Sequence, residues 1–120
     1  MSLKLKSRQT DGVIVVDMIG RITGGEPQML LRETVRRCVA DGNHRLVLNL
    51  SEVNYVDSSG LGELISSKCL LAKQGGQVNL LGLTKRVKDL LVMTRLVVEF
   101  ESFDDEAKAV AALQEDPHTD

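Results

Sequence analysis

Alternation between apolar and polar residues along the chain predicts a set of short strands. Residues 3–8 alternate apolar and charged side chains, which is the period of a half-exposed strand. Asp11-Gly12 is typical of hairpin turns, and the branched residues at 13–19 predict a second strand after it. Further strands are predicted at residues 45–50, 77–81 and 96–100. After the first of these, residues 51–54 are expected to form a short connection that leads into Tyr55-Val56.

Apolar residues spaced three and four apart predict four helices between and after these strands. Pro27 suits the first turn of the first helix, and Thr84 is expected to cap the third helix at 85–93. Ser102 and Asp105 have capping-box-like spacing before the fourth helix. The residues expected on the buried faces are Leu31, Val35, Cys38 and Val39, then Leu61, Leu64, Ile65, Cys69 and Ala72, then Val87, Leu90 and Leu91, and finally Ala107, Val110 and Ala111.

The order of these elements, β-β-α-β-α-β-α-β-α, predicts an α/β fold. Alternation of strands and helices is typical of a layered domain with a largely parallel sheet, here after an opening hairpin. We therefore expect one domain at residues 1–113, with a mixed, mostly parallel sheet of about five strands and about four helices. Residues 114–120, which include Pro117, are expected to form a flexible C-terminal tail.

Composition and charge exclude several classes of function. The net charge is −2, so no bulk attraction to nucleic acid is expected. No apolar run approaches roughly 20 residues, and the N-terminus lacks a signal-peptide pattern. A cytoplasmic protein without a membrane span is therefore expected. Cys38 and Cys69 are expected to be free, buried thiols, and two distant histidines, His44 and His118, add no metal spacing. No cofactor is expected.

The run from Asp57 to Gly62, Asp-Ser-Ser-Gly-Leu-Gly, is the strongest candidate for a functional site. It follows a predicted strand and opens a predicted helix, a place where α/β sheets commonly bind ligands. Asp57 or Ser58 can cap the helix, so a cap without any function is the alternative interpretation. Gly60 and Gly62 favour function, because each costs roughly 1 kcal/mol in a helix and leaves room for a partner or a phosphate.

Catalytic interpretations of the same run lack the necessary residues. A nucleophile elbow needs glycine two positions before the serine, but Val56 precedes Ser58 there and Asp57 precedes Ser59. A Gly-x-Gly-x-x-Gly phosphate loop is not completed, because Ile65 stands at the last position. We therefore do not expect an enzyme.

Residues 46–100 contain several short motifs. In chain order, these are Leu46-Val47-Leu48-Asn49-Leu50, Val53, Val56-Asp57-Ser58-Ser59-Gly60-Leu61-Gly62, Gly75-Gly76 and Val87-Lys88-Asp89-Leu90-Leu91. With these motifs the chain resembles the STAS domain of bacterial anti-sigma factor antagonists, and Glu101 to Ala107 is similar to the start of that family's last helix. Including the N-terminal hairpin, the likeness covers nearly the whole chain.

The resemblance implies a regulatory binding module. In that family the first serine after the aspartate, here Ser58, is phosphorylated by a partner that is both anti-sigma factor and serine kinase, and a phosphatase reverses the step. The unphosphorylated form binds this partner and releases the sigma factor. Asp57 is then expected to orient the site, with Ser59, Gly60, Leu61 and Gly62 at the docking surface. The alternative is a sensory or scaffold STAS module that binds a small anion or nucleotide at the same turn.

Two positions depart from the family pattern. Family members often have an acidic residue in a Gly-x-Leu-Asp-like run, whereas this chain has Gly20-Arg21-Ile22-Thr23. Thr23 is therefore included among the expected partner-binding residues, and the identity of the partner stays open. Arg95 stands where a glycine is common, which affects the expected shape of that loop. A monomer or weak dimer is expected.

Overall fold

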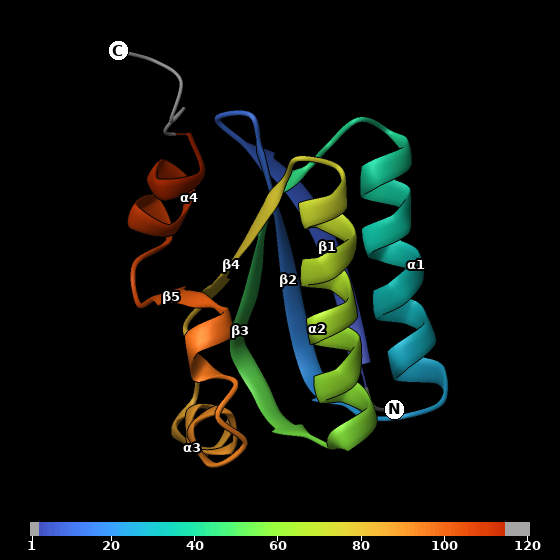
Figure 1. Cartoon of the computed structure of the whole chain (residues 1–120), viewed down its shortest axis with the longest axis vertical. Helices are drawn as coiled ribbons and strands as arrows, with labels where there is room; N and C mark the ends of the chain where they lie inside the picture. Colours follow the sequence, from blue (N-terminus) through green and yellow to red (C-terminus); the bar gives the residue numbers. More distant parts are fainter. Residues whose placement is uncertain (1–2, 115–120) are drawn as a thin grey trace.

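The computed structural model describes residues 3–114, which form a five-stranded sheet with helices on both of its faces (Figure 1). The predicted α/β class, with about five strands and four α-helices, is confirmed. The predicted tail at 114–120 stays a prediction, because residues 115–120 lie outside the described residues. The elements are β1 (Leu3–Thr10), β2 (Val13–Ile22), α1 (Glu26–Ala40), β3 (Arg45–Val56), α2 (Ser58–Lys73), β4 (Gln77–Leu81), α3 (Lys85–Met93), the 3-10 helix η1 (Val97–Glu99), β5 (Glu101–Phe103) and α4 (Glu106–Gln114).

The strands lie in the order β1-β2-β3-β4-β5, and only β1 is antiparallel to its neighbour. The predicted hairpin at Asp11-Gly12 is confirmed, with φ angles of 51° and 82° that turn the chain between β1 and β2. Because β2 and β3 are parallel neighbours, they end at the same edge of the sheet, where Ile22 pairs with Val56. The segments that follow these two strands are therefore brought together.

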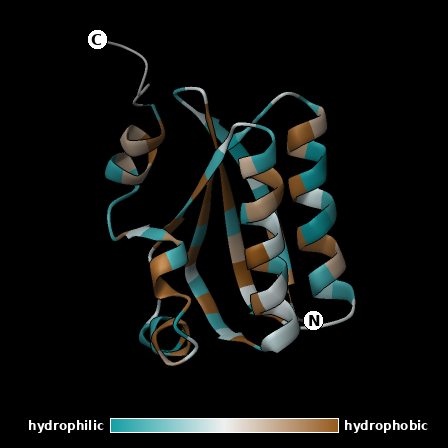
Figure 2. Cartoon of the chain, in the orientation of Figure 1, coloured by the Kyte–Doolittle hydropathy of each residue, from teal (hydrophilic) through white to brown (hydrophobic). Residues whose placement is uncertain are grey.

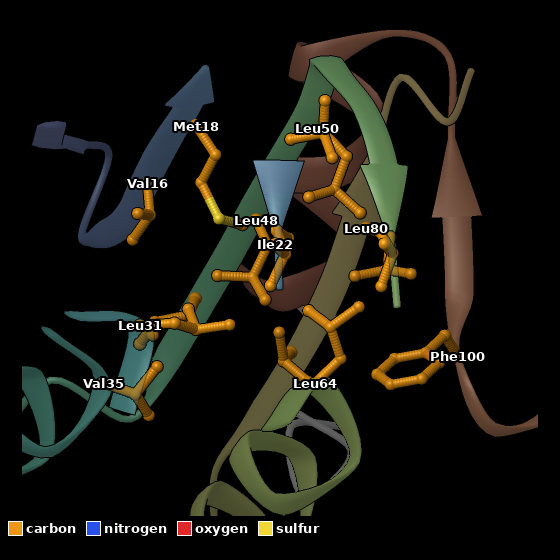
Figure 3. Packing of buried hydrophobic residues seen from close by; sticks show 14 of the residues in the cluster. Val16, Met18, Ile22, Leu31, Val35, Leu48, Leu50, Leu64, Leu80 and Phe100 are labelled. Carbon is orange, nitrogen blue, oxygen red and sulfur yellow. The ribbon is translucent and has the colours of Figure 1, made fainter. Parts of the chain in front are cut away.

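The two faces of the sheet have separate hydrophobic clusters. The larger cluster joins the sheet to α1, α2 and α3, and Figure 3 shows Leu31 of α1 and Leu64 of α2 directed toward strand residues such as Leu48. The smaller cluster joins the opposite face to α4 through residues such as Val47 and Val110. Leucine, valine and isoleucine supply most of both clusters, as the scarcity of aromatic residues predicts.

Arg8 of β1 joins α4 to the sheet. Its Nε donates to Asp17 Oδ2 at 2.7 Å, and its Nη1 donates to Glu106 Oε2 at 2.8 Å. These hydrogen bonds from Arg8 lower the pKa of both carboxyl groups. The three side chains are about one-third exposed, so each pair contributes only about 0.2–1 kcal/mol, and its main effect is on orientation.

Two predicted segment boundaries were wrong. Residues 51–54 do not form a connection, because β3 runs without a break from Arg45 to Val56 and keeps pairing with β2 through two register shifts. The predicted strand at 96–100 is instead η1, and the pairing with β4 begins only at Glu101. Arg95, at φ 62°, ends α3 by turning the chain so that the Leu96 N–H donates to the Leu91 carbonyl at 2.9 Å.

Several predicted buried positions also differ. Cys38 is buried, and this burial raises the pKa of its thiol, but Cys69 is exposed, as is Ala72. The reason is that α2 packs against both the sheet and α1, so its buried face includes Glu63 and Ser67 instead. In α4, Ala107 and Ala111 are exposed, while Ala109, Val110 and Leu113 are buried. The cap of α4 is the Asp105 side chain, which accepts from the Ala107 N–H at 2.7 Å, and Ser102 belongs to β5.

Candidate functional site

The candidate site lies where β2 and β3 end and α1 and α2 begin, at the lower end of the molecule in Figure 1. We call residues 57–62 the β3–α2 turn and residues 23–25 the β2–α1 loop. The Asp57 N–H donates to the Ile22 carbonyl at 3.2 Å, which joins the ends of the two strands. Two segments more than 30 residues apart in the chain therefore form one continuous surface.

Asp57 bridges the two segments of this surface. Its Oδ1 accepts from the Gly60 N–H at 2.8 Å, which caps α2, and its Oδ2 accepts from the Gly24 N–H at 3.1 Å. Of the two caps that the sequence allows, Asp57 is the N-cap, and Ser58 is the first residue of the helix. The carboxylate therefore fixes the β2–α1 loop against the start of α2 in addition to ending the helix.

The hydrogen bonds to Asp57 also affect its ionisation. The N–H groups of Gly60 and, to a smaller degree, Gly24 lower the pKa of the Asp57 carboxyl below its ordinary value of 3.8. A carboxyl group whose pKa is lower in the folded than in the unfolded state stabilises the fold at pH values above its ordinary pKa. That contribution is lost as the pH falls through the folded-state pKa.

Asp57→Asn is expected to lower the melting temperature at pH 7, because the charged acceptor of two backbone N–H groups is lost. The difference from the unchanged protein should begin to shrink as the pH falls below the ordinary pKa of 3.8, where the unfolded chain takes up a proton at Asp57, and it should shrink further toward the lower pKa of the folded state. Thermal unfolding between pH 7 and pH 3 measures this difference. Asp104→Asn, at an exposed position, is the matched control. A difference that stays constant over this range would contradict the assignment.

Gly60 and Gly62 have different structural roles. A Cβ built on Gly60 would lie 2.0 Å from the Ile22 carbonyl oxygen, so α2 can approach β2 only because this residue has no side chain. A Cβ built on Gly62 meets nothing within 4 Å. Gly60 is therefore required by packing, and Gly62 alone leaves open space for an approaching partner.

Ser58 and Ser59 are both exposed but have different surroundings. A Cβ built on Gly24 would lie 3.1 Å from both Cβ and Oγ of Ser59, so Ser59 stands against the β2–α1 loop. Within residues 3–114, the Ser58 hydroxyl has no hydrogen-bond partner and is open to solvent. The first turn of α2 is pale in Figure 2, which marks intermediate hydropathy, and beneath it Leu61 is buried in the core.

The β2–α1 loop places Thr23 beside the β3–α2 turn, and its role in partner binding stays a prediction. Thr23 is half-buried and directly precedes Gly24, whose N–H donates to Asp57. The structure thus brings together Thr23, Asp57, Ser58, Ser59 and Gly62 at one surface, with Gly60 and Leu61 below it.

A buried carboxylate that sequence reasoning missed joins α1 to α2. Glu63 is 3% exposed, and its Oε1 accepts from Arg32 Nη2 at 2.9 Å and from Gln28 Nε2 at 3.3 Å. The signal for this contact is an acidic residue between apolar ones on a helix that begins at the candidate site. Because these bonds lie one turn after Ser59, they orient the start of α2 relative to α1.

A second missed feature lies beside the turn. The Arg21 guanidinium stands over the Tyr55 ring, 5.0 Å from its centroid, since these two residues are paired across β2 and β3. Register shifts in this part of the sheet determine the pairing, and single-residue shifts of this kind are not evident from sequence periodicity.

Residues 3–114 lack both a membrane-spanning helix and a cluster of metal-binding side chains. None of the helices in this part of the chain combines the length and the apolar composition needed to cross a bilayer. Its histidine, cysteine and carboxylate side chains do not gather in threes as a metal site requires.

Comparison with known proteins relates this geometry to a family. A model of the STAS domain matches residues 4–109. The chain is 26% identical over 117 residues to a Paenibacillus polymyxa protein named anti-sigma F factor antagonist, covering 95% of this chain and 97% of that protein. It is 29% identical over 96 residues to the anti-sigma-B factor antagonist of Bacillus subtilis (strain 168), covering 80% and 86%. The crystal structure of an anti-sigma factor antagonist from Mycobacterium paratuberculosis superposes with a TM-score of 0.81 at 25% identity, covering 95% and 96%.

Proposed function

The chain belongs to the STAS domain family, and we propose that it acts in this family as an anti-sigma factor antagonist that phosphorylation of Ser58 switches off. The observation that supports the proposal most strongly is the geometry of Ser58, an exposed hydroxyl on the first residue of α2, directly after the Asp57 bridge. Two relatives that match over most of their length have names that describe the same activity. The partner in this proposal is an anti-sigma factor that is also a serine kinase, and a phosphatase restores the unphosphorylated form.

The position of Ser58 suits a switch that acts without refolding. A phosphate adds about −1.5 to −2 charges at pH 7, and the N-terminus of a helix favours negative charge. The domain therefore tolerates the modified residue. The surface around it becomes more negative, because the phosphate lies beside the Asp57 carboxylate, and a partner that accepts the neutral hydroxyl then meets two adjacent anions.

The remaining residues of the turn have supporting roles in this proposal. Thr23, Ser59 and Gly62 line the surface that the partner contacts, and Asp57 keeps its two segments together. Gly60 and Leu61 act from below by packing α2 against the sheet. None of these residues has a catalytic role, so the module regulates by binding. We place the boundary of this module near residue 113.

The direct test is phosphorylation of the purified chain. Incubation with ATP and the anti-sigma factor/serine kinase of the same organism is expected to add one phosphate, which mass spectrometry should map to Ser58. Ser58→Ala should abolish the modification and keep partner binding. Ser59→Ala is the matched control and should be phosphorylated at Ser58 as before. Phosphate on Ser59, or equal modification of the Ser58→Ala protein, would overturn the assignment of the acceptor.

A further inference from the structure

An open apolar groove lies between the end of β3 and α3, next to the β3–α2 turn. Its volume is about 610 Å³, and its apolar lining is formed by Tyr55, Val56, Val87, Leu90 and Met93. The Met93 side chain is 80% exposed and Tyr55 is 37% exposed, so a considerable apolar surface faces solvent. We call this feature the α3 groove, and Figure 1 shows α3 at the same end of the sheet as the turn.

A polar hollow of about 540 Å³ adjoins the α3 groove, and Tyr55 and Arg86 line both. The hollow is lined by Arg21, Asn54, Tyr55, Thr84 and Arg86. Arg21 and Arg86 are exposed, and neither forms a salt bridge within the part of the chain that the structure describes. Lys85, in contrast, is paired with Asp89 at 2.8 Å. Two guanidinium groups without a carboxylate partner therefore line the hollow, and that of Arg86 also lines the groove, although the net charge of the whole chain is −2.

We propose that the α3 groove and its two arginines bind an acidic segment of the partner anti-sigma factor. In this arrangement one apolar side chain of the segment occupies the groove, and neighbouring carboxylates pair with Arg21 and Arg86. The proposal rests on the function proposed above, and it adds the chemistry of the second contact. Arginine suits this role because its planar guanidinium binds carboxylates through two parallel hydrogen bonds.

Position and shape favour a protein segment as the occupant. Tyr55 and Val56 directly precede Asp57 and Ser58 in the chain. A partner that covers Ser58 therefore lies close enough to contact the groove as well. A small-molecule site normally buries about 70–90% of the surface of its ligand, whereas this groove is open along one side. Aromatic and arginine side chains are also the residues most enriched in protein interfaces.

The test measures partner binding by variants of the two arginines. Arg21→Glu and Arg86→Glu are each expected to weaken binding by at least about tenfold, with a larger effect at low salt. Arg37→Glu, on the exposed side of α1 near its opposite end, is the matched control and should bind normally. Hydrogen exchange of the complex should show protection of both the β3–α2 turn and α3.

A second probe examines the groove without the partner. Tyr55 is the only tyrosine and the chain has no tryptophan, so its fluorescence reports on this site alone. The probe is a synthetic peptide, Asp-Glu-Leu-Asp-Glu, which contains no aromatic residue. It should change the Tyr55 emission of the unchanged protein and of Ser58→Asp, but not of the double variant Arg21→Glu, Arg86→Glu.

These outcomes separate the groove from the proposed switch. If Ser58→Asp abolishes partner binding but Arg21→Glu and Arg86→Glu bind like Arg37→Glu, the groove proposal is wrong and the switch stands. If the arginine variants weaken binding but Ser58→Asp does not, the switch is wrong and the groove stands. If no anti-sigma factor binds at all, the peptide decides, and an unchanged Tyr55 emission overturns the groove proposal.

Discussion

Gly60→Ala is expected to lower the free energy of unfolding by about 1–3 kcal/mol and the melting temperature by roughly 10 °C. The added Cβ would lie 2.0 Å from the Ile22 carbonyl oxygen, 2.7 Å from its carbonyl carbon and 2.9 Å from its Cγ2. Alanine normally stabilises a helix by about 1 kcal/mol relative to glycine. The contact with Ile22 reverses this gain, because α2 has to move away from β2.

The surroundings of Gly60 leave little freedom to relieve this contact. Ile22 is 0% exposed, and its carbonyl also accepts the Asp57 N–H at 3.2 Å. On the other side, Leu61 and Leu64 fix α2 in the main hydrophobic cluster. Interiors of this density respond to an added methyl group by strain in the backbone. Displacement of α2 should also lengthen the contacts of Asp57, so partner binding is expected to fall with stability.

Gly62→Ala is the matched control for this prediction. Its Cβ meets nothing within 4 Å, and the residue is exposed in the same turn of α2. This substitution is expected to raise stability by up to about 1 kcal/mol through helix propensity alone. Urea denaturation of the two variants measures the contrast. A Gly60→Ala protein as stable as Gly62→Ala would show that α2 does not need this close approach to Ile22.

The sequence correctly predicted turns and helix caps that are formed by residues adjacent in the chain. Asp11-Gly12 formed the expected hairpin because its two residues adopt the positive φ angles that the turn requires. Thr84 formed the expected cap, accepting from the Val87 N–H at 3.4 Å. At the site the sequence allowed either Asp57 or Ser58 as the cap of α2, and the structure has Asp57.

Features that depend on distant segments were not predicted. The role of Gly60 depends on Ile22, which is far away in the chain and becomes a neighbour only through the pairing of β2 with β3. The second hydrogen bond of Asp57, to Gly24, has the same origin. The strand predicted at residues 96–100 failed for a local reason instead, because the turn at Arg95 leads into η1 and outweighs the β propensity of these residues.

Ser58→Asp is expected to weaken binding to the partner anti-sigma factor by about 100-fold, or about 2.7 kcal/mol. The new carboxylate stands on an exposed position beside Asp57, and a docked partner would enclose both charges without a counter-ion. Such juxtaposed like charges cost several kcal/mol in an interface. A phosphate at the same position should have a larger effect, because it has about twice the charge of an aspartate at pH 7.

The same substitution should not weaken the fold, and this difference distinguishes a switch from a damaged surface. Ser58 is the first residue of α2, where a negative charge contributes about 0.3–1 kcal/mol through the helix dipole. Ser58→Asp should therefore keep or raise the melting temperature while it loses the partner, and Ser58→Ala should keep the partner. Ser66→Asp, at an exposed serine two turns later in α2, is the matched control and should bind normally. Titration calorimetry with the partner measures the affinities. Equal affinities for Ser58→Asp and Ser66→Asp would contradict the switch, because the effect of the charge would then not depend on its position.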